Sequence, residues 1–163
     1  MGPRGAAPQK RDSAMDRDDV ISTLNDLIET SKDGEEGFRT CADNVKNATL
    51  RTFFLEKAER CREGAVQLQN IVREMGGDPE QRSSMAGAMH RFWVNIRGTI
   101  SGMDDHAILA ECERGEDIAK RSYENALAQD LPGDVRMVVE RQYREVKANH
   151  DRVKELRNMT APA

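Results

Sequence analysis

The chain has 163 residues, which is long enough for one domain with its own core. Charged residues make up 33% of it, and the acidic and basic side chains are interleaved, with a formal net charge of -4. This distribution excludes the clustered positive charge of a nucleic-acid-binding surface. No apolar run approaches the roughly 20 residues that cross a bilayer. We therefore expect neither nucleic acid nor a membrane as a partner.

Residues 1–15 combine Pro, Gly, Ala and charged residues without periodicity, so we expect a disordered leader. They lack the apolar segment of a secretory signal. The three cysteines, Cys41, Cys61 and Cys112, are an odd number in a chain too large to depend on disulfides. We therefore predict reduced thiols and a cytoplasmic protein. Residues 16–158 are expected to form a single domain, and residues 159–163 a frayed tail.

Helices are predicted wherever apolar residues recur at steps of three and four. The first should run from about residue 16 to 44. The second should begin after the capping residue Asn47 and end at 75, before two glycines and Pro79. A shorter helix is expected over 84–101, followed by long helices over 105–129 and 135–158. No strand-like alternation occurs, so the predicted fold class is all-α.

Each long helix has one apolar stripe, and we expect these stripes to meet in a common core. The stripes are represented by Leu24, Phe54, Ala119 and Val146. Gly34 and Gly37 interrupt the first helix, and each costs up to about 1 kcal/mol relative to alanine. Close approach of another helix would offset that cost. Glu35 lies beside Gly34 on the same stripe, so its carboxylate is the first polar group that the pattern places inside.

Three stretches carry a resemblance to a known family: residues 27–38 (LIETSKDGEEGF), 111–117 (ECERGED) and 149–154 (NHDRVK). Together, in this order and spacing, they resemble a bacterial family of uncharacterised ferritin-like four-helix-bundle proteins. The resemblance covers about residues 16–158. It implies four long helices with a helical crossover between the second and third, a part that the segment 84–101 would play.

Ferritin-like di-iron proteins take one Glu from each of two helices and a Glu-x-x-His pair from each of the other two. The positions that best match this set, as implied by the resemblance, are Glu35, Glu59, Glu111 and His150. Glu113 is an alternative to Glu111. However, Arg62 and Lys147 occupy positions that require His and Glu, and cations repel a metal. A partly buried ion pair or a solvated flank of the helix is therefore the favoured interpretation of Glu35. A satisfied core histidine is the favoured interpretation of His150.

The acidic residues of the predicted helix over 105–129, Glu113, Glu116 and Asp117, are expected to form a solvated face. Basic residues at helical spacing on the same segment would pair with them. Cys112, on the same segment, has no base nearby in the sequence, so we assign it no nucleophilic role.

Two functional hypotheses follow. The first is a non-enzymatic structural or interaction role, with a possible homodimer formed through Phe92 and Trp93. The alternative is a metal-binding or redox protein that holds iron or another divalent metal with the reduced ligand set above. The first hypothesis, which we favour, requires no cofactor. Neither hypothesis identifies a small-molecule substrate.

Overall fold

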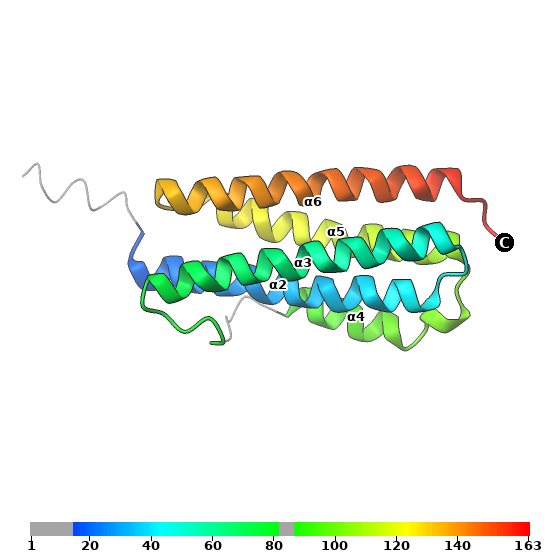
Figure 1. Cartoon of the computed structure of the whole chain (residues 1–163), viewed down its shortest axis with the longest axis horizontal. Coiled ribbons are helices and arrows are strands. Elements are labelled where there is room, and N and C mark those ends of the chain that lie inside the picture. Colours follow the sequence, from blue (N-terminus) through cyan, green and yellow to red (C-terminus); the bar gives the residue numbers. More distant parts are fainter. Residues whose placement is uncertain (1–14, 82–86) are drawn as a thin grey trace, which may run out of the picture.

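The computed structural model describes residues 15–81 and 87–163, and within them the fold is all-helical (Figure 1). The α-helices are α2 (Arg17–Asn44), α3 (Ala48–Glu74), α4 (Ala88–Arg97), α5 (Asp105–Leu127) and α6 (Gly133–Met159), with a 3-10 turn, η2 (Ile100–Gly102). No strand occurs in these ranges, which confirms the all-α prediction. The expected leader lies outside the described residues except for Met15. No helix in the described part of the chain is long and apolar enough to cross a membrane.

Helices α2, α3, α5 and α6 lie side by side, and α4 lies outside them against α2 and α5 (Figure 1). The chain leaves α3 at one end, returns along the outside through α4, and enters α5 at the opposite end (Figure 1). Consequently α3 and α5 run in the same direction. Helix α2 packs mainly against α3, and α5 against α6, whereas α3 and α6 make few contacts with each other. The side between α3 and α6 is therefore the loosely packed one.

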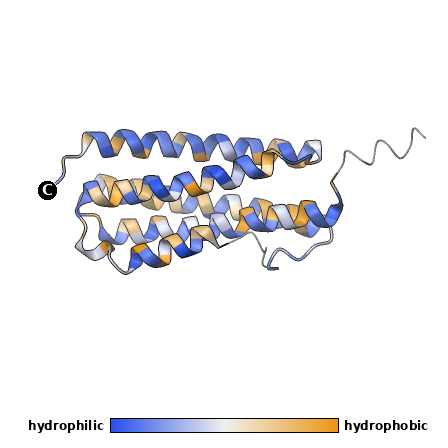
Figure 2. Cartoon of the chain, turned by 180° about the vertical axis from the view of Figure 1, so that it is seen from behind, coloured by the Kyte–Doolittle hydropathy of each residue, from blue (hydrophilic) through white to orange (hydrophobic). Residues whose placement is uncertain are grey.

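The predicted apolar stripes meet in the interior. Leu24 and Phe54 are fully buried, Ala119 is buried, and Val146 packs against both hydrophobic clusters of the core. Figure 2 shows the same segregation, with α6 mostly hydrophilic on the face in view. Burial of these stripes is the main contribution to stability, because each fully buried Leu or Phe side chain contributes about 1.5–3 kcal/mol.

The helix ends follow the local chemistry of the sequence. Asn47 caps α3 by accepting a hydrogen bond from the backbone N–H of Leu50 (3.0 Å), as predicted. At the other end of α3, Gly76 adopts a φ of 82°, and the N–H of Gly77 donates to the carbonyl of Val72 (2.9 Å). This αL arrangement at Gly76 is one that only glycine adopts without strain.

The crossover helix is shorter than predicted. Helix α4 has ten residues, which corresponds to about 15 Å of helix. Gly87, with a φ of 136°, lies immediately before it, and Gly98 lies immediately after it. The start of the predicted segment, residues 84–86, lies outside the described residues. After residue 97, a turn and the 3-10 helix η2 connect α4 to the start of α5.

A single indole docks α4 onto the long helices. A Cβ added at Gly37 of α2 would overlap the ring of Trp93, and one added at Gly115 of α5 would lie 2.9 Å from its Cζ2 atom. The expectation that a close approach offsets the cost of a mid-helix glycine is thus confirmed at Gly37. Trp93 is only 4% exposed, so it faces the interior of its own chain and is not available on the surface.

The last residues are held against the start of α5. Nδ1 of His106 lies 2.7 Å from the carbonyl oxygen of Thr160, and the backbone N–H of Ala163 donates to Oδ2 of Asp104 (2.7 Å). Met159, which we expected in a frayed tail, is the last residue of α6. These contacts place residues 160–163 against α5, and fraying of this tail stays a prediction.

Candidate functional site

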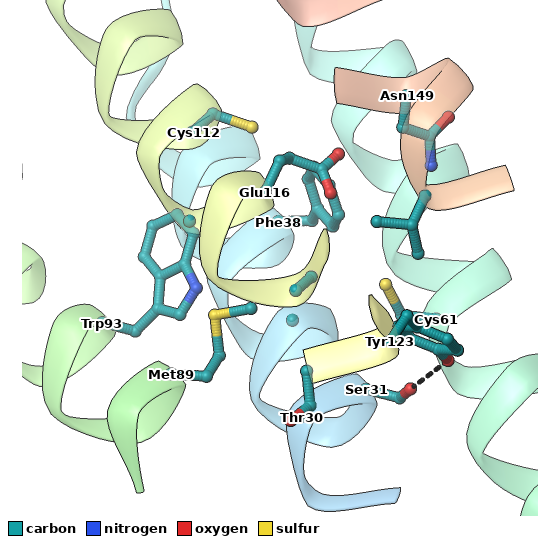
Figure 3. Close-up of a pocket in the computed structure, with 14 residues that line it drawn as sticks. Thr30, Ser31, Phe38, Cys61, Met89, Trp93, Cys112, Glu116, Tyr123 and Asn149 are labelled. Carbon is teal, nitrogen blue, oxygen red and sulfur yellow. Dashed lines mark hydrogen bonds between the residues drawn. The ribbon is translucent and has the colours of Figure 1, made fainter. Parts of the chain in front are cut away.

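A cavity of about 50 Å³ lies at the centre of the molecule, where side chains from α2, α3, α4, α5 and α6 converge (Figure 3). Its walls combine apolar groups, among them Phe38, Met89 and Trp93, with the polar side chains of Ser31 and Glu116. A space of this size admits a few water molecules or one end of a small ligand.

Glu116 is the acidic group of this cavity. It is 6% exposed, and its Oε1 atom has no hydrogen-bond partner among the described residues. Figure 3 shows its carboxyl group directed from α5 toward Asn149 of α6. Burial raises the pKa of Glu116 to about 8, an effect that Lys57 opposes and Asp117 increases. The carboxyl group is therefore mostly protonated and neutral at pH 7.

The prediction of a solvated Glu116 is wrong. The residue follows Cys112 by four positions and precedes Ala119 by three, so it falls on the buried stripe of α5. That spacing was visible in the sequence. The outward orientation was preferred because charged residues flank Glu116 on both sides, as is typical of a solvated helix face. Packing against α2 and α4 turns this side of α5 inward.

A hydrogen-bond network spans the helices beside Glu116. The hydroxyl of Tyr123 donates to Oε1 of Gln142 (2.8 Å), and Nε2 of Gln142 donates to Oε1 of Gln67 (2.9 Å) and to the carbonyl of Gly64 (3.3 Å). The Ser31 hydroxyl lies 3.4 Å from that of Tyr123 (Figure 3). The network thus joins α2, α5, α6 and α3. The sequence pattern predicted a functional role for none of these polar residues.

Trp93 contributes a second unpartnered polar atom. Its Nε1 atom is buried without a hydrogen-bond partner in the described part of the chain, and the ring lines the cavity. Buried donors and acceptors are nearly always paired in native proteins. An indole N–H and a carboxyl oxygen in the same cavity lining are therefore available to pair with water or with polar groups of a ligand.

Two further cavities lie between this cavity and the loosely packed side of the molecule. A second cavity of about 50 Å³ shares Ser31, Cys61, Tyr123, Val146 and Asn149 with the first. A third, of about 190 Å³, shares Arg60, Gly64, Gln142 and Glu145 with the second. The three cavities therefore follow one another from the groove between α3 and α6 toward Glu116, and we call this row of neighbouring cavities the α3–α6 channel.

Two ion pairs that share Arg60 lie at the outer end of the α3–α6 channel. Arg60 of α3 contacts Glu145 of α6 at 2.5 Å and Glu63 of its own helix at 3.6 Å. All three side chains are about half exposed, so the pairs are hydrated and individually weak. The charges at the entrance can therefore rearrange at small cost.

The three cysteines are free, which agrees with the prediction of reduced thiols. Burial raises the pKa of both Cys61 and Cys112. The carboxylates of Glu116, Glu35 and Glu145 also raise the pKa of Cys61, whereas Lys57 lowers it. These two thiols are therefore neutral at pH 7, and a neutral thiol is a poor nucleophile.

The three carboxylates of the predicted metal set each pair with an arginine of their own helix. The pairs are Glu35–Arg39, Glu59–Arg62 and Glu111–Arg114. Glu35 is 22% exposed and lies 2.9 Å from its arginine, so it forms the partly buried ion pair that we favoured. Glu59 is 46% exposed. Within residues 15–81 and 87–163, no group of three or more His, Cys, Asp or Glu side chains is placed so that it could hold a metal ion.

His150, the fourth member of the predicted set, faces acidic residues of α5. Its Nε2 atom lies 2.7 Å from Oδ1 of Asp117 and 3.9 Å from Oε2 of Glu113. Glu113 also forms an ion pair with Arg157 of α6 (2.6 Å). Glu113 and Asp117 were expected to pair with basic residues of their own segment. They instead connect α5 to α6, because these two helices pack along their length.

In the part of the chain that the structure describes, the fold and the site define an all-helical protein with a buried carboxyl group whose Oε1 atom has no protein partner. The chain belongs to a family described as a domain of unknown function (DUF2383), which matches residues 19–129. The matched region contains α2, α3, α4 and α5, and therefore Glu116, while α6 lies beyond it. No curated protein matches the chain.

Proposed function

We propose that this protein is a ferritin-like four-helix bundle with a non-enzymatic interaction role, in which it binds a small ligand inside the bundle. The observation that carries this proposal is the unpartnered Oε1 atom of Glu116 beside an interior cavity. The ferritin-like part is supported by the chain path, because α3 and α5 run in parallel and are joined by the crossover that contains α4 (Figure 1).

The chemistry of the cavity favours binding over conversion. Burial raises the pKa of Glu116, Cys61, Cys112 and Tyr123, so each of these groups is neutral at pH 7. Neutral thiols and a protonated acid are poor nucleophiles and poor bases. They are suitable hydrogen-bonding partners for a ligand, because a protonated carboxyl group both donates and accepts.

A cytoplasmic location is part of the proposal. The three free cysteines support it, because thiols persist in the reducing cytoplasm and are commonly oxidised outside it. Cell fractionation tests the location. Light scattering at high concentration tests the proposed homodimer; because Trp93 faces inward, a dimer would have to use other side chains of α4 or another surface.

The experiment that tests the binding role is a thermal-shift screen with small amines, alcohols and carboxylic acids. At least one class is expected to raise the melting temperature of the wild type. Glu116→Leu should abolish that rise, and Glu56→Gln, which changes an exposed acid on α3, should retain it. A rise that persists in Glu116→Leu, or no rise with any class, would contradict a ligand in this cavity.

The same preparation tests the alternative metal-binding role. The protein is purified without chelator and its metal content is measured. We expect less than stoichiometric metal and no change in melting temperature when iron is added. Stoichiometric iron that is lost in Glu35→Gln or His150→Ala would overturn the proposal and favour an iron protein.

A further inference from the structure

The strongest unassigned feature of the interior is the carboxyl group of Glu116. A buried polar atom without a partner costs about 1–3 kcal/mol, and more when the group is charged. Its Oε1 atom is buried without a hydrogen-bond partner among the described residues, in a cavity that borders a second one between α3 and α6. A ligand that supplies the missing partner would recover this free energy, so the site favours a molecule with a hydrogen-bond donor at its inner end.

The carboxylates around the inner cavity are already paired with basic side chains. The preference for a cation over an anion therefore comes from Glu116 itself, which becomes a carboxylate when it pairs with an ammonium group. Glu35 of α2 and Glu145 of α6 act on Cys61 with the same sign as Glu116. Asp117 of α5 acts on Glu116 in the same way, and Lys57 of α3 opposes it. Helix α4 contributes Met89 and Trp93, which do not titrate. The remaining titratable groups of the lining, the Cys61 and Cys112 thiols and the Tyr123 phenol, are neutral at pH 7.

The shape of the α3–α6 channel favours a linear ligand. Two cavities of about 50 Å³ each and an outer cavity of about 190 Å³ lie in a row, so a ligand that occupies more than one of them must be elongated. Phe38, Met89 and Trp93 provide apolar walls for methylene groups at the inner end. Glu63 and Glu145 at the outer end are held by Arg60 and can accept a second cationic group.

We propose that the α3–α6 channel binds a linear aliphatic amine, with its terminal ammonium group hydrogen bonded to Oε1 of Glu116 and its chain directed toward Glu145. This inference rests on the proposed binding role and names the chemical class of the ligand. The ammonium group brings its charge into the cavity, and Glu116 becomes a carboxylate. The proton of its carboxyl group leaves to solvent, so charge and atoms balance.

Proton release gives the proposal a pH signature. Below the pKa of Glu116, which is about 8, binding must first ionise the acid. The dissociation constant should therefore decrease by up to about tenfold for each unit of pH between 6 and 8, and level off above. Aliphatic amines have a pKa near that of lysine, about 10.4, so the ligand itself stays charged over this range.

The test is isothermal titration calorimetry of the wild-type chain with 1,4-diaminobutane, 1-butanol and butyrate. Titrations at pH 7 are run in phosphate and in HEPES, two buffers with different ionisation enthalpies. The difference between the two observed binding enthalpies gives the number of protons released. We expect binding of the diamine alone, with nearly one proton released. Glu116→Gln should weaken binding at least about tenfold, the loss of one charge-assisted hydrogen bond, and Glu56→Gln should leave it unchanged.

Each outcome is informative, including the case in which Glu116→Gln does not fold. Diamine binding by the wild type without proton release, or with a pH-independent dissociation constant, would overturn the role of Glu116. Binding of butanol or butyrate as tightly as the diamine would overturn the amine class while leaving the binding role intact. If none of the three binds and the wider screen also shows no ligand, both proposals fail.

Discussion

Trp93 of α4 occupies the space that a side chain at Gly37 of α2 would require. The indole also lies against Gly115 of α5, at 2.9 Å from the position of an added Cβ. Gly37 and Gly115 each weaken their own helix, but together they leave the space that the indole of Trp93 fills. The stability of the crossover depends on this fit.

Gly37→Ala is expected to destabilise the protein, because the new methyl group must displace the buried indole. Overpacking of this kind costs about 1–3 kcal/mol, which exceeds the up to about 1 kcal/mol that alanine gains over glycine within a helix. Urea denaturation followed by circular dichroism measures the difference.

Gly34→Ala is the matched control on the same helix. Its Cβ would lie 3.4 Å from Sγ of Cys61, an ordinary van der Waals contact, so this variant should be as stable as the wild type or up to about 1 kcal/mol more stable. Equal effects of the two substitutions would contradict the special fit of Trp93.

Glu116 should make the folding free energy depend on pH. Its pKa in the folded protein, about 8, exceeds the ordinary glutamate value of about 4.3. Between these values the folded state retains a proton that the unfolded chain has lost, so stability is greatest near the lower value and falls as pH rises toward 8. The limiting slope is about 1.4 kcal/mol per pH unit.

Glu116→Gln should remove this dependence, because glutamine is neutral at every pH and has nearly the same shape. Urea denaturation of both proteins at several values between pH 5 and pH 9 should give a steeper decrease for the wild type. Parallel curves for the two proteins would show that Glu116 is ionised in the folded state at neutral pH.

Tyr123→Phe should destabilise the protein by about 1–3 kcal/mol, since it leaves the buried Oε1 of Gln142 without its donor. Tyr143→Phe is a matched control, because the Tyr143 hydroxyl donates to Glu124 in an exposed pair (2.7 Å). Its removal should change stability by less than about 0.5 kcal/mol. Thermal denaturation of the two variants gives the comparison, and similar losses would argue that the buried network is not special.

Asn47→Ala should cost about 1 kcal/mol, because the Asn47 side chain accepts the N–H of Leu50 at the start of α3 (3.0 Å). Asp16→Ala removes the N-cap residue of α2, whose side chain makes no capping hydrogen bond, so its effect should be smaller. Chemical denaturation distinguishes the two, and an equal or larger loss in Asp16→Ala would refute the capping argument.

The burial of Leu24, Phe54 and Ala119 and the packing of Val146 against the core were predictable, and so were the Asn47 cap and most helix boundaries. Each of these depends on the 3.6-residue helical repeat or on hydrogen bonds between residues close in sequence. The sequence also predicted that Gly37 meets a close neighbour, but not that the neighbour is Trp93. That pairing joins residues 56 positions apart, and no local rule selects it.

Only the tertiary structure decided which acidic side chains of α5 are buried in the core. Glu116 and Asp117 are adjacent, yet Glu116 is buried in the cavity and Asp117 pairs with His150 of α6 at 2.7 Å. Helical periodicity leaves the rotation of α5 uncertain by about one residue, roughly 100°. Contacts with α2, α4 and α6 settle that rotation, and with it which carboxyl group loses water and stays protonated.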